Sequence, residues 1–312
     1  MPCVALLSEV LDMDYLASAF REVHPGIDVR AGDDLGAMDE IDLAVCWFPP
    51  HGRLAQMPNL RLVQSLAAGV DHILADTGLP RALPLCRIVD TGMSAGMKAY
   101  VCWAVVQQHR GMRAYVANSA AGRWQEQPVV APGQYRVGIA GLGTLGQACA
   151  EALATIGYQV RGWSRSAKAN LPAGVTAFHG PDQLDDFLSG CDTLVCLLPL
   201  TRETQGFLSA ELFAKLPRGA HLINVGRGDH LVEADLLQAL QQGQLSAATL
   251  DALSQEPLPP AHPFWKDPRI LVTPHIATRT DRLVIAQQAL ANLAALQQGI
   301  RPVNQVDIDR GY

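Results

Sequence analysis

A chain of 312 residues is longer than a single hydrophobic core usually organises, so two domains are expected. Hydrophobic residues make up 49% of the sequence and charged residues 17%, a balance that excludes an intrinsically disordered chain. The formal net charge of −6 argues against general binding to nucleic acids or to anionic membranes, so neither is expected as a partner.

The first hundred residues alternate between short apolar segments and a segment of helical character. A helix is predicted from Asp12 to Val23. Such alternation is typical of a parallel sheet. The strands are predicted at Val4 to Leu7, Ile27 to Arg30, Leu43 to Trp47 and Leu60 to Ser65.

A long apolar helix is predicted from Met93 to Arg113, and a polar, glycine-containing stretch follows from Asn118 to Gly133. We expect a domain junction near this point. A second alternation of strands and helices runs from Arg136 to Val272. A last helix, Asp281 to Gln298, has apolar residues at helical spacing and is expected to return the chain to the first domain.

The second alternation opens on a glycine motif. The apolar run from Val137 passes into Gly141, Gly143 and Gly146, and a helix-forming segment follows from Gln147 to Ile156. In a G-x-G-x-x-G turn the first glycine permits the tight turn, the second lets backbone amides approach a pyrophosphate, and the third lets the helix lie close to the strand. Thr144 and Leu145 complete the motif. It predicts a dinucleotide-binding turn, with a purely structural turn as the alternative.

The end of the next strand, Tyr158 to Trp163, indicates which dinucleotide binds. Enzymes that use NAD carry a carboxylate at this point, which binds the ribose 2′-hydroxyl. Here the strand ends in Ser164, Arg165 and Ser166 instead. A guanidinium between two hydroxyls suits a 2′-phosphate, so NADPH is favoured and NADH is expected to be used less well. A solvated arginine in a loop is the alternative, and Lys168 could share the role.

Three later segments each place a reactive side chain after a predicted strand. Arg227 follows Gly219 to Val225, Glu256 follows Ala247 to Leu250, and His275 ends the strand at Leu271. Taken singly, they fit a solvated arginine, a turn before proline and a structural histidine. Together they predict an anion clamp and an acid/base group tuned by a carboxylate, because ligands gather at the carboxyl ends of parallel strands.

Seven cysteines form no C-x-x-C pair and have no matching histidine cluster, so neither zinc nor a disulfide framework is indicated. Most are expected in the core. The N-terminal segment lacks a basic region, and no run of about 18 apolar residues occurs. A cytoplasmic protein is therefore expected.

Six motifs in a fixed order resemble the D-isomer-specific 2-hydroxyacid dehydrogenase family over nearly the whole chain. They are Ser65 to Ile73, Gly141 to Gly146, Leu197 to Thr201 with Thr204, Asn224 to Gly228, Leu250 to Pro259 and Thr273 to Ala277. Within the family, Cys46 to Pro50, Tyr100 with Val101, and the ending Gln305 to Tyr312 resemble the glyoxylate/hydroxypyruvate reductases of the A type.

The resemblance implies an α/β fold of two domains. A flavodoxin-like substrate domain would comprise residues 1–100 completed by 281–312, and a doubly wound Rossmann cofactor domain would comprise residues 101–280. A homodimer through the cofactor domain is also implied. The resemblance further implies that Ala68 and Gly69 bind the substrate carboxylate through backbone amides, and that Trp47 walls the substrate side, although a core role for Trp47 is equally open.

By resemblance, Arg227 binds the carboxylate and carbonyl oxygen of a small 2-oxo acid, His275 gives the proton, and Glu256 orients the imidazole and favours its charged form. The implied lining of the nicotinamide pocket is Pro199, Leu200, Val225 and Asp251, with Thr204 in the adjoining motif. The expected reaction is NADPH-dependent reduction of glyoxylate or hydroxypyruvate to glycolate or D-glycerate.

Three alternatives stay open. Another D-2-hydroxyacid dehydrogenase would take a different 2-oxo acid. A nucleotide-sensing relative would keep the fold without turnover, although it would not need Arg227, Glu256 and His275 together. A formate dehydrogenase-like activity is less favoured, because that branch carries Gln at the position of Glu256.

Overall fold

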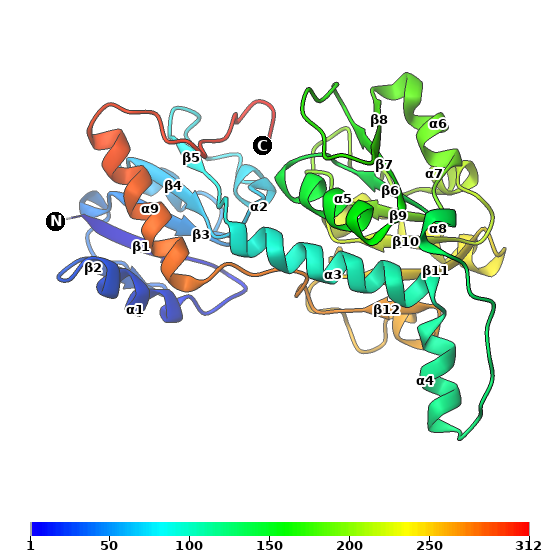
Figure 1. Cartoon of the computed structure of the whole chain (residues 1–312). Coiled ribbons are helices and arrows are strands. Elements are labelled where there is room, and N and C mark those ends of the chain that lie inside the picture. Colours follow the sequence, from blue (N-terminus) through cyan, green and yellow to red (C-terminus); the bar gives the residue numbers. More distant parts are fainter. Residues whose placement is uncertain (1, 312) are drawn as a thin grey trace. The chain divides into compact units, whose positions relative to one another are not determined.

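The computed structural model describes residues 2–311, so Met1 and Tyr312 lie outside the described part, the latter being the end of the Gln305 to Tyr312 segment. The chain divides into two compact units (Figure 1). Unit 1 comprises residues 2–92 and 280–311, and unit 2 comprises residues 93–279. Both are built from parallel strands and helices, which confirms the predicted α/β class.

Unit 1 contains a five-stranded sheet in the order β2-β1-β3-β4-β5, and every strand pair is parallel. This is the flavodoxin-like strand order. The strands are β1 (Cys3–Leu7), β2 (Asp28–Ala31), β3 (Leu43–Cys46), β4 (Leu62–Ser65) and β5 (Leu85–Cys86), and the helices are α1 (Asp14–Val23), α2 (Asp71–Leu74) and α9 (Arg282–Gln297).

The C-terminal helix α9 packs within unit 1. It lies beside α1 and contacts β3 and β4 (Figure 1). Its buried Asn292 donates from Nδ2 to Gln64 Oε1 of β4 at 2.8 Å, a polar contact that fixes the helix register over the sheet. Ile285, Ala289 and Leu293 supply the apolar part of the same face.

Unit 2 contains a seven-stranded parallel sheet in the order β12-β11-β10-β9-β6-β7-β8. Counted from β6, the order is 3-2-1-4-5-6 with one strand added, which is the doubly wound arrangement. Its strands are β6 (Arg136–Ala140), β7 (Gln159–Ser164), β8 (Val175–His179), β9 (Thr193–Cys196), β10 (Ala220–Asn224), β11 (Leu245–Leu250) and β12 (Ile270–Val272).

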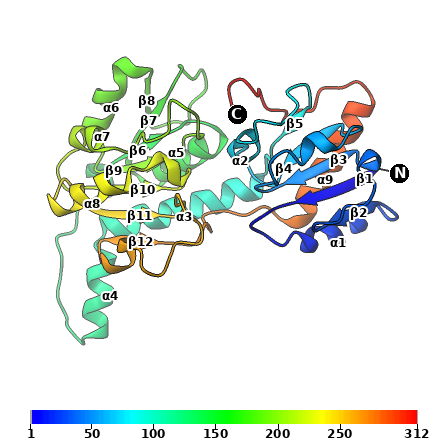
Figure 2. The ribbon, with the colours of Figure 1, turned by 180° about the vertical axis from the view of Figure 1, so that it is seen from behind.

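Unit 2 has two helices that precede its first strand, α3 and α4, and four helices, α5 to α8, that connect strands of its sheet (Figure 2). They are α3 (Thr91–His109), whose first two residues belong to unit 1, α4 (Met112–Ala120), α5 (Thr144–Ile156), α6 (Leu184–Ser189), α7 (Ala210–Lys215) and α8 (Glu233–Gln241). Helix α5 begins at Thr144, so Leu145 and Gly146 lie in its first turn. The helix therefore starts directly after the second glycine of the motif.

Two predictions about the middle of the chain are wrong. The helix expected from Met93 to Arg113 ends at His109, and a second helix that was not expected, α4, runs from Met112 to Ala120 into the polar stretch. Gly111 separates the two helices with φ 61°, a left-handed conformation that glycine adopts without strain. Figure 1 shows α4 extending away from the sheet of unit 2.

Six of the seven cysteines are buried and Cys102 is half-buried, so the prediction that most belong to the core is confirmed. All seven are free thiols. Within residues 2–311, no helix is both long and apolar enough to cross a bilayer. Within the same residues, no three His, Cys, Asp or Glu side chains are grouped so as to hold a metal ion.

Candidate active site

Three neighbouring strands of unit 2 place the predicted reactive residues at one edge of the sheet. The order β12-β11-β10 makes these strands adjacent and parallel, so their carboxyl ends lie side by side. His275 follows β12, Glu256 follows β11 and Arg227 follows β10. Residues 19 to 48 positions apart in the chain are thereby brought to one edge, because parallel strands share the edge at which they end.

His275 and Glu256 form a direct pair. His275 Nδ1 lies 2.9 Å from Glu256 Oε2 and 3.1 Å from Oε1. A carboxylate can only accept hydrogen bonds, so Nδ1 carries a proton and its N–H donates a hydrogen bond to the two carboxylate oxygens. The side chains are 33% and 37% exposed, which leaves part of the imidazole accessible. The geometry leaves Nε2 as the atom able to exchange a proton with a bound molecule.

The environment of Glu256 favours its charged form. Burial raises the pKa of this carboxyl, but the hydrogen bond from His275 and the N–H of Leu253 outweigh it, and the charges of His275 and Arg227 act in the same direction. Leu253 N lies 2.9 Å from Glu256 Oε1. The net result is a pKa below the ordinary value, so Glu256 is an anion at neutral pH.

A compact turn holds Arg227. Asn224 ends β10, and its side chain forms two hydrogen bonds to the backbone of the turn. Nδ2 donates to the Arg227 carbonyl at 2.9 Å, and Oδ1 accepts from Gly226 N at 3.2 Å. The guanidinium donates from Nη1 to the Gly226 carbonyl at 3.0 Å. A Cβ on Gly228 would lie 1.9 Å from the Leu253 carbonyl carbon, so only glycine lets this turn pack against the loop of Glu256.

A buried carboxylate supports the loop that carries His275. This histidine has φ 52°, a strained value for a residue other than glycine. Asp251 is buried, and its carboxylate accepts the N–H groups of Ile276 and Ala277, both at 2.8 Å. The neighbouring backbone bonds therefore hold the strained residue in place.

The support extends to helix α3. The Thr273 hydroxyl donates to Asp251 Oδ1 at 2.6 Å, and the Tyr100 hydroxyl lies 2.5 Å from Thr273 Oγ1. Burial raises the pKa of Tyr100 to about 12, so the phenol stays neutral. Sequence reasoning named Asp251 only as part of a nicotinamide pocket, and gave no role to Thr273 or to the hydroxyl of Tyr100. No spacing rule reveals a contact between residues this far apart.

Two glycines of the motif, Gly141 and Gly146, lie where no larger residue fits. Gly141 has φ 107°, and a Cβ there would lie 2.6 Å from the Leu197 carbonyl oxygen. A Cβ on Gly146 would lie 1.8 Å from the carbonyl oxygen of Gly141. Beside Gly143, by contrast, a Cβ would meet nothing within 4 Å. This open space at the N-terminus of the 13-residue helix α5 fits a pyrophosphate.

The end of β7 presents Arg165 in an exposed turn. Ser164 Oγ donates to the Ser166 carbonyl at 2.9 Å, so one hydroxyl shapes the turn. Nearby, a hydrogen bond with Thr201 lowers the pKa of Glu203, and the charges of Arg165 and Arg202 add to the effect. Sequence reasoning did not single out Arg202 or Glu203, which belong to a separate strand-end loop.

That loop follows β9 and carries Pro199 and Leu200, two of the residues predicted to line the nicotinamide pocket; the other two, Val225 and Asp251, follow β10 and β11. Thr204 Oγ1 donates to the Pro199 carbonyl at 2.7 Å and accepts from Thr201 N at 2.8 Å. Leu200 is half-buried, and Val225 is buried. Thr204 therefore closes the loop on itself, and β9 lies between β10 and β6 in the sheet, close to both the arginine turn and the glycines.

The candidate substrate residues of unit 1 lie after β3 and β4. The ring of Trp47 packs against Phe48 and His72, with ring centroids 5.1 Å and 4.6 Å away. Ser65 Oγ accepts from Ala67 N at 3.1 Å and donates to the Gly69 carbonyl at 2.7 Å. This hydroxyl shapes the tight turn that contains Ala68 and Gly69.

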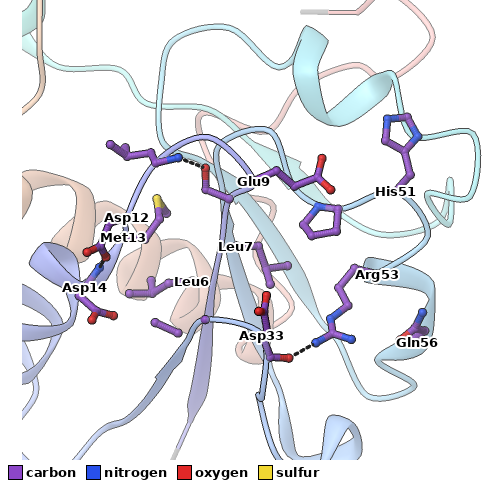
Figure 3. A pocket seen from close by; sticks show the side chains of 15 residues that line it. Leu6, Leu7, Glu9, Asp12, Met13, Asp14, Asp33, His51, Arg53 and Gln56 are labelled. Atoms are coloured by element: carbon purple, nitrogen blue, oxygen red, sulfur yellow. Dashed lines mark hydrogen bonds between the residues drawn. The ribbon is translucent and has the colours of Figure 1, made fainter. Parts of the chain in front are cut away.

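A separate cavity lies in unit 1. It has a volume of about 870 Å³ and lies at the carboxyl ends of β1 and β2 (Figure 3). Its charged or titratable lining consists of Glu9, Asp12, Asp14 and Asp33 together with Arg53 and His51. Four carboxylates repel an anion, so this cavity does not suit an anionic ligand and is distinct from the His275 site.

Comparison with known proteins gives a consistent result. Residues 102–277 match the family described as D-isomer specific 2-hydroxyacid dehydrogenase, NAD binding domain. Glyoxylate/hydroxypyruvate reductase A of Serratia proteamaculans (strain 568) is 44% identical over 296 residues, covering 92% of this chain and 93% of the relative.

Solved structures are similar over the full length. A D-isomer specific 2-hydroxyacid dehydrogenase from Xanthobacter autotrophicus Py2, in complex with NADPH and MES, is 40% identical with a TM-score of 0.92, covering 100% of this chain and 99% of that chain. An NADPH-dependent glyoxylate/hydroxypyruvate reductase from Sinorhizobium meliloti, in complex with NADP and sulfate, is 36% identical with a TM-score of 0.92 and full coverage of both chains.

Proposed function

Because this chain belongs to the D-isomer-specific 2-hydroxyacid dehydrogenase family, we propose that it reduces a small 2-oxo acid, glyoxylate or hydroxypyruvate, with NADPH as the reductant. The observation that carries this proposal is the pair formed by His275 and Glu256 beside the turn of Arg227. The relatives named for this reaction are similar over nearly the whole chain, which supports the same substrate class.

NADPH would supply the hydride that reduces the carbonyl carbon of the oxo acid. The residues present fit it: the glycine motif leaves room for a pyrophosphate at the start of α5, and Arg165 presents a cation at the end of β7. We propose that Ser164 and Ser166 accompany Arg165 at the 2′-phosphate. Pro199, Leu200 and Val225 would border the nicotinamide, and the hydroxyl of Thr204 holds the loop of Pro199 and Leu200 closed.

Arg227 binds the substrate in this proposal. A guanidinium pairs with a carboxylate through two parallel hydrogen bonds and also stabilises negative charge that grows on a carbonyl oxygen. His275 would give its Nε2 proton to that oxygen, because Nδ1 is committed to Glu256. Glu256, an anion by its lowered pKa, would hold the ring in orientation and favour the charged imidazole.

We further propose that unit 1 is the substrate domain and unit 2 the cofactor domain. Ala68 and Gly69 would bind the substrate carboxylate through backbone amides in the turn shaped by Ser65. Trp47 would face the substrate, with its ring supported by His72. The seven free thiols fit a reducing compartment, and the cytoplasm is the proposed location.

A homodimer is proposed through the segment that extends from unit 2, here called the arm (residues 112–133). Its Val116, Trp124 and Val129 are exposed, with Trp124 98% accessible. Large apolar side chains on a projecting segment are costly in water and mark an interaction surface. We propose that a second copy of this chain covers them.

Steady-state assays test the activity. Purified protein mixed with NADPH and either glyoxylate, hydroxypyruvate, pyruvate or a longer branched 2-oxo acid should consume NADPH, most efficiently with one of the first two. A preference for pyruvate or the branched acid would assign a different substrate within the family. Binding of NADPH without turnover of any of the four would support a nucleotide sensor instead.

A further inference from the structure

A fully buried histidine lies between the Arg227 turn and the Pro199 loop. His230 has no accessible surface and ends the short 3-10 turn Gly228–His230. Its Nδ1 lies 3.0 Å from Arg227 N, and its Nε2 lies 3.3 Å from the Pro199 carbonyl oxygen. One imidazole therefore contacts the backbone of two segments that border the proposed reaction site.

These two partners define the form of the ring. A backbone N–H only donates, so Nδ1 must be an acceptor without a proton. A backbone carbonyl only accepts, so Nε2 must carry the proton. His230 is therefore assigned as the neutral Nε2-protonated tautomer, from its hydrogen-bond partners. A charged ring would set Nδ1–H against the N–H of Arg227.

The ring of His230 packs closely against the neighbouring backbone. A Cβ on Gly226 would lie 2.9 Å from His230 Nδ1, so the ring packs directly over this glycine. The carbonyl of His230 accepts from Leu208 N at 2.8 Å. The guanidinium of Arg227 in turn donates to the Gly226 carbonyl, so the imidazole supports both the backbone and the side-chain direction of the arginine.

We propose that His230 is a positioning residue whose neutral ring sets the Arg227 guanidinium relative to the Pro199 loop. The inference rests on the proposed function, because it takes Arg227 to bind the oxo acid and Pro199 to border the nicotinamide. His230 acts through the bond to the Arg227 N–H and does not touch the reacting atoms. The site then uses two histidines in opposite ways: His275 gives a proton, and His230 must not gain one.

Two conservative variants separate the two hydrogen bonds. The terminal amide of asparagine reaches the position of Nδ1, so His230→Asn can keep the acceptor for Arg227 N while losing the contact to Pro199. The longer glutamine reaches the position of Nε2, so His230→Gln can keep the donor to Pro199 while losing the bond to Arg227. His230→Leu removes both.

The three variants are expected to differ in their KM for glyoxylate. It should rise about threefold to tenfold in His230→Gln and His230→Leu, the range for loss of one neutral hydrogen bond, and stay within about twofold of wild type in His230→Asn. The kcat should change less than the KM in each variant. Rates are expressed per NADPH-binding site, and the concentration of these sites is measured by fluorescence titration. An unfolded fraction of the protein therefore does not lower the kcat.

His221 provides a matched control. It is also buried in unit 2, and its Nε2 lies 3.1 Å from Thr249 Oγ1 in the adjacent strand. His221→Asn should lower the melting temperature and leave the KM for glyoxylate unchanged. An equal rise of KM in His221→Asn, or identical KM values in His230→Asn and His230→Gln, would show that His230 only stabilises the fold.

Two measurements do not depend on turnover. The ¹⁵N spectrum of the imidazole should show a protonated Nε2 and an unprotonated Nδ1, and the opposite tautomer or a charged ring would overturn the inference. Calorimetric titration of the NADP complex with oxalate should give weaker binding in His230→Gln than in His230→Asn, and equal binding would count against the inference. If wild type fails to reduce glyoxylate, the proposed function falls, while the spectrum and the oxalate comparison still decide the role of His230.

Discussion

Arg165 is the residue on which cofactor choice depends in the proposed function. Arg165→Asp should weaken NADPH binding about tenfold to a hundredfold, because a charge-assisted hydrogen bond contributes roughly 1.5 to 3 kcal/mol and repulsion of the 2′-phosphate is added. The use of NADH should fall much less. Fluorescence titration with both cofactors measures the change, and a wild type that prefers NADH would contradict the assignment.

Arg227 and His275 should fail in different ways. Arg227→Ala should raise the KM for the oxo acid and lower kcat, because binding and charge stabilisation are both lost. His275→Ala should mainly lower kcat, by roughly 10² to 10⁴, as expected for a lost general acid. NADPH binding should survive in both variants. Near-normal kcat in His275→Ala would remove this residue from the acid role.

Glu256 should control the pH range of reduction. Because its pKa is lowered, the Glu256 carboxylate is charged at neutral pH. This negative charge is lost only as the pH falls through the lowered pKa. On the alkaline side, reduction needs the charged imidazole, which a neighbouring anion favours. In Glu256→Gln, activity should therefore begin to fall at a lower pH as the pH rises. An unchanged alkaline limb in a folded, NADPH-binding variant would assign Glu256 to the loop alone.

Individual side chains were predictable to different degrees. Arg227, Glu256 and His275 could be named from the sequence, because each follows a strand and the carboxyl ends of parallel strands meet. Asn224 and His230 could not be given their roles, since these depend on atoms of loops brought together only in the folded chain. The hydroxyl contact of Tyr100 with Thr273 has the same origin: it spans 173 residues.

At the scale of elements, the first turn of α5 lies in close contact with the glycine that follows β6. In Gly146→Ala, the new Cβ would lie 1.8 Å from the Gly141 carbonyl oxygen, a distance at which the two atoms would overlap. The helix must therefore shift away from the strand. NADPH affinity should fall at least tenfold because the pyrophosphate cradle opens. Gly143→Ala is the comparison, since its Cβ meets nothing in the protein. It should leave the melting temperature unchanged, whereas Gly146→Ala should lower it.

Element boundaries followed from local pattern wherever glycine and apolar spacing agreed. The start of β6 and the end of α5 at Ile156 are two such cases, the latter because Gly157 with φ 104° caps the helix. The break between α3 and α4 was missed, because a single glycine is tolerated in many helices. Here Gly111 takes a left-handed conformation that no helix interior contains.

The arm belongs to the scale of the whole molecule. Trp124→Ser combined with Val116→Glu should shift the protein from twice the mass of one chain to the mass of a single chain, because an exposed apolar surface no longer gains from being covered. Light scattering after size-exclusion chromatography measures the mass. Val303→Glu, on the exposed tail of unit 1, is the control and should leave the mass unchanged. A wild type with the mass of one chain would remove the proposed dimer.

The division into two units also bears on the order in which the protein is made. Unit 2 is one continuous stretch, whereas unit 1 needs residues 280–311 to be complete, including α9. Between the emergence of residue 92 and residue 297 the ribosome adds 205 residues, which takes about 10 to 40 seconds at ordinary rates of synthesis. For that time the face of the first sheet that α9 will cover stays bare. In the nascent chain, unit 2 is therefore complete before unit 1. The early strands of unit 1 are the part that needs protection from aggregation.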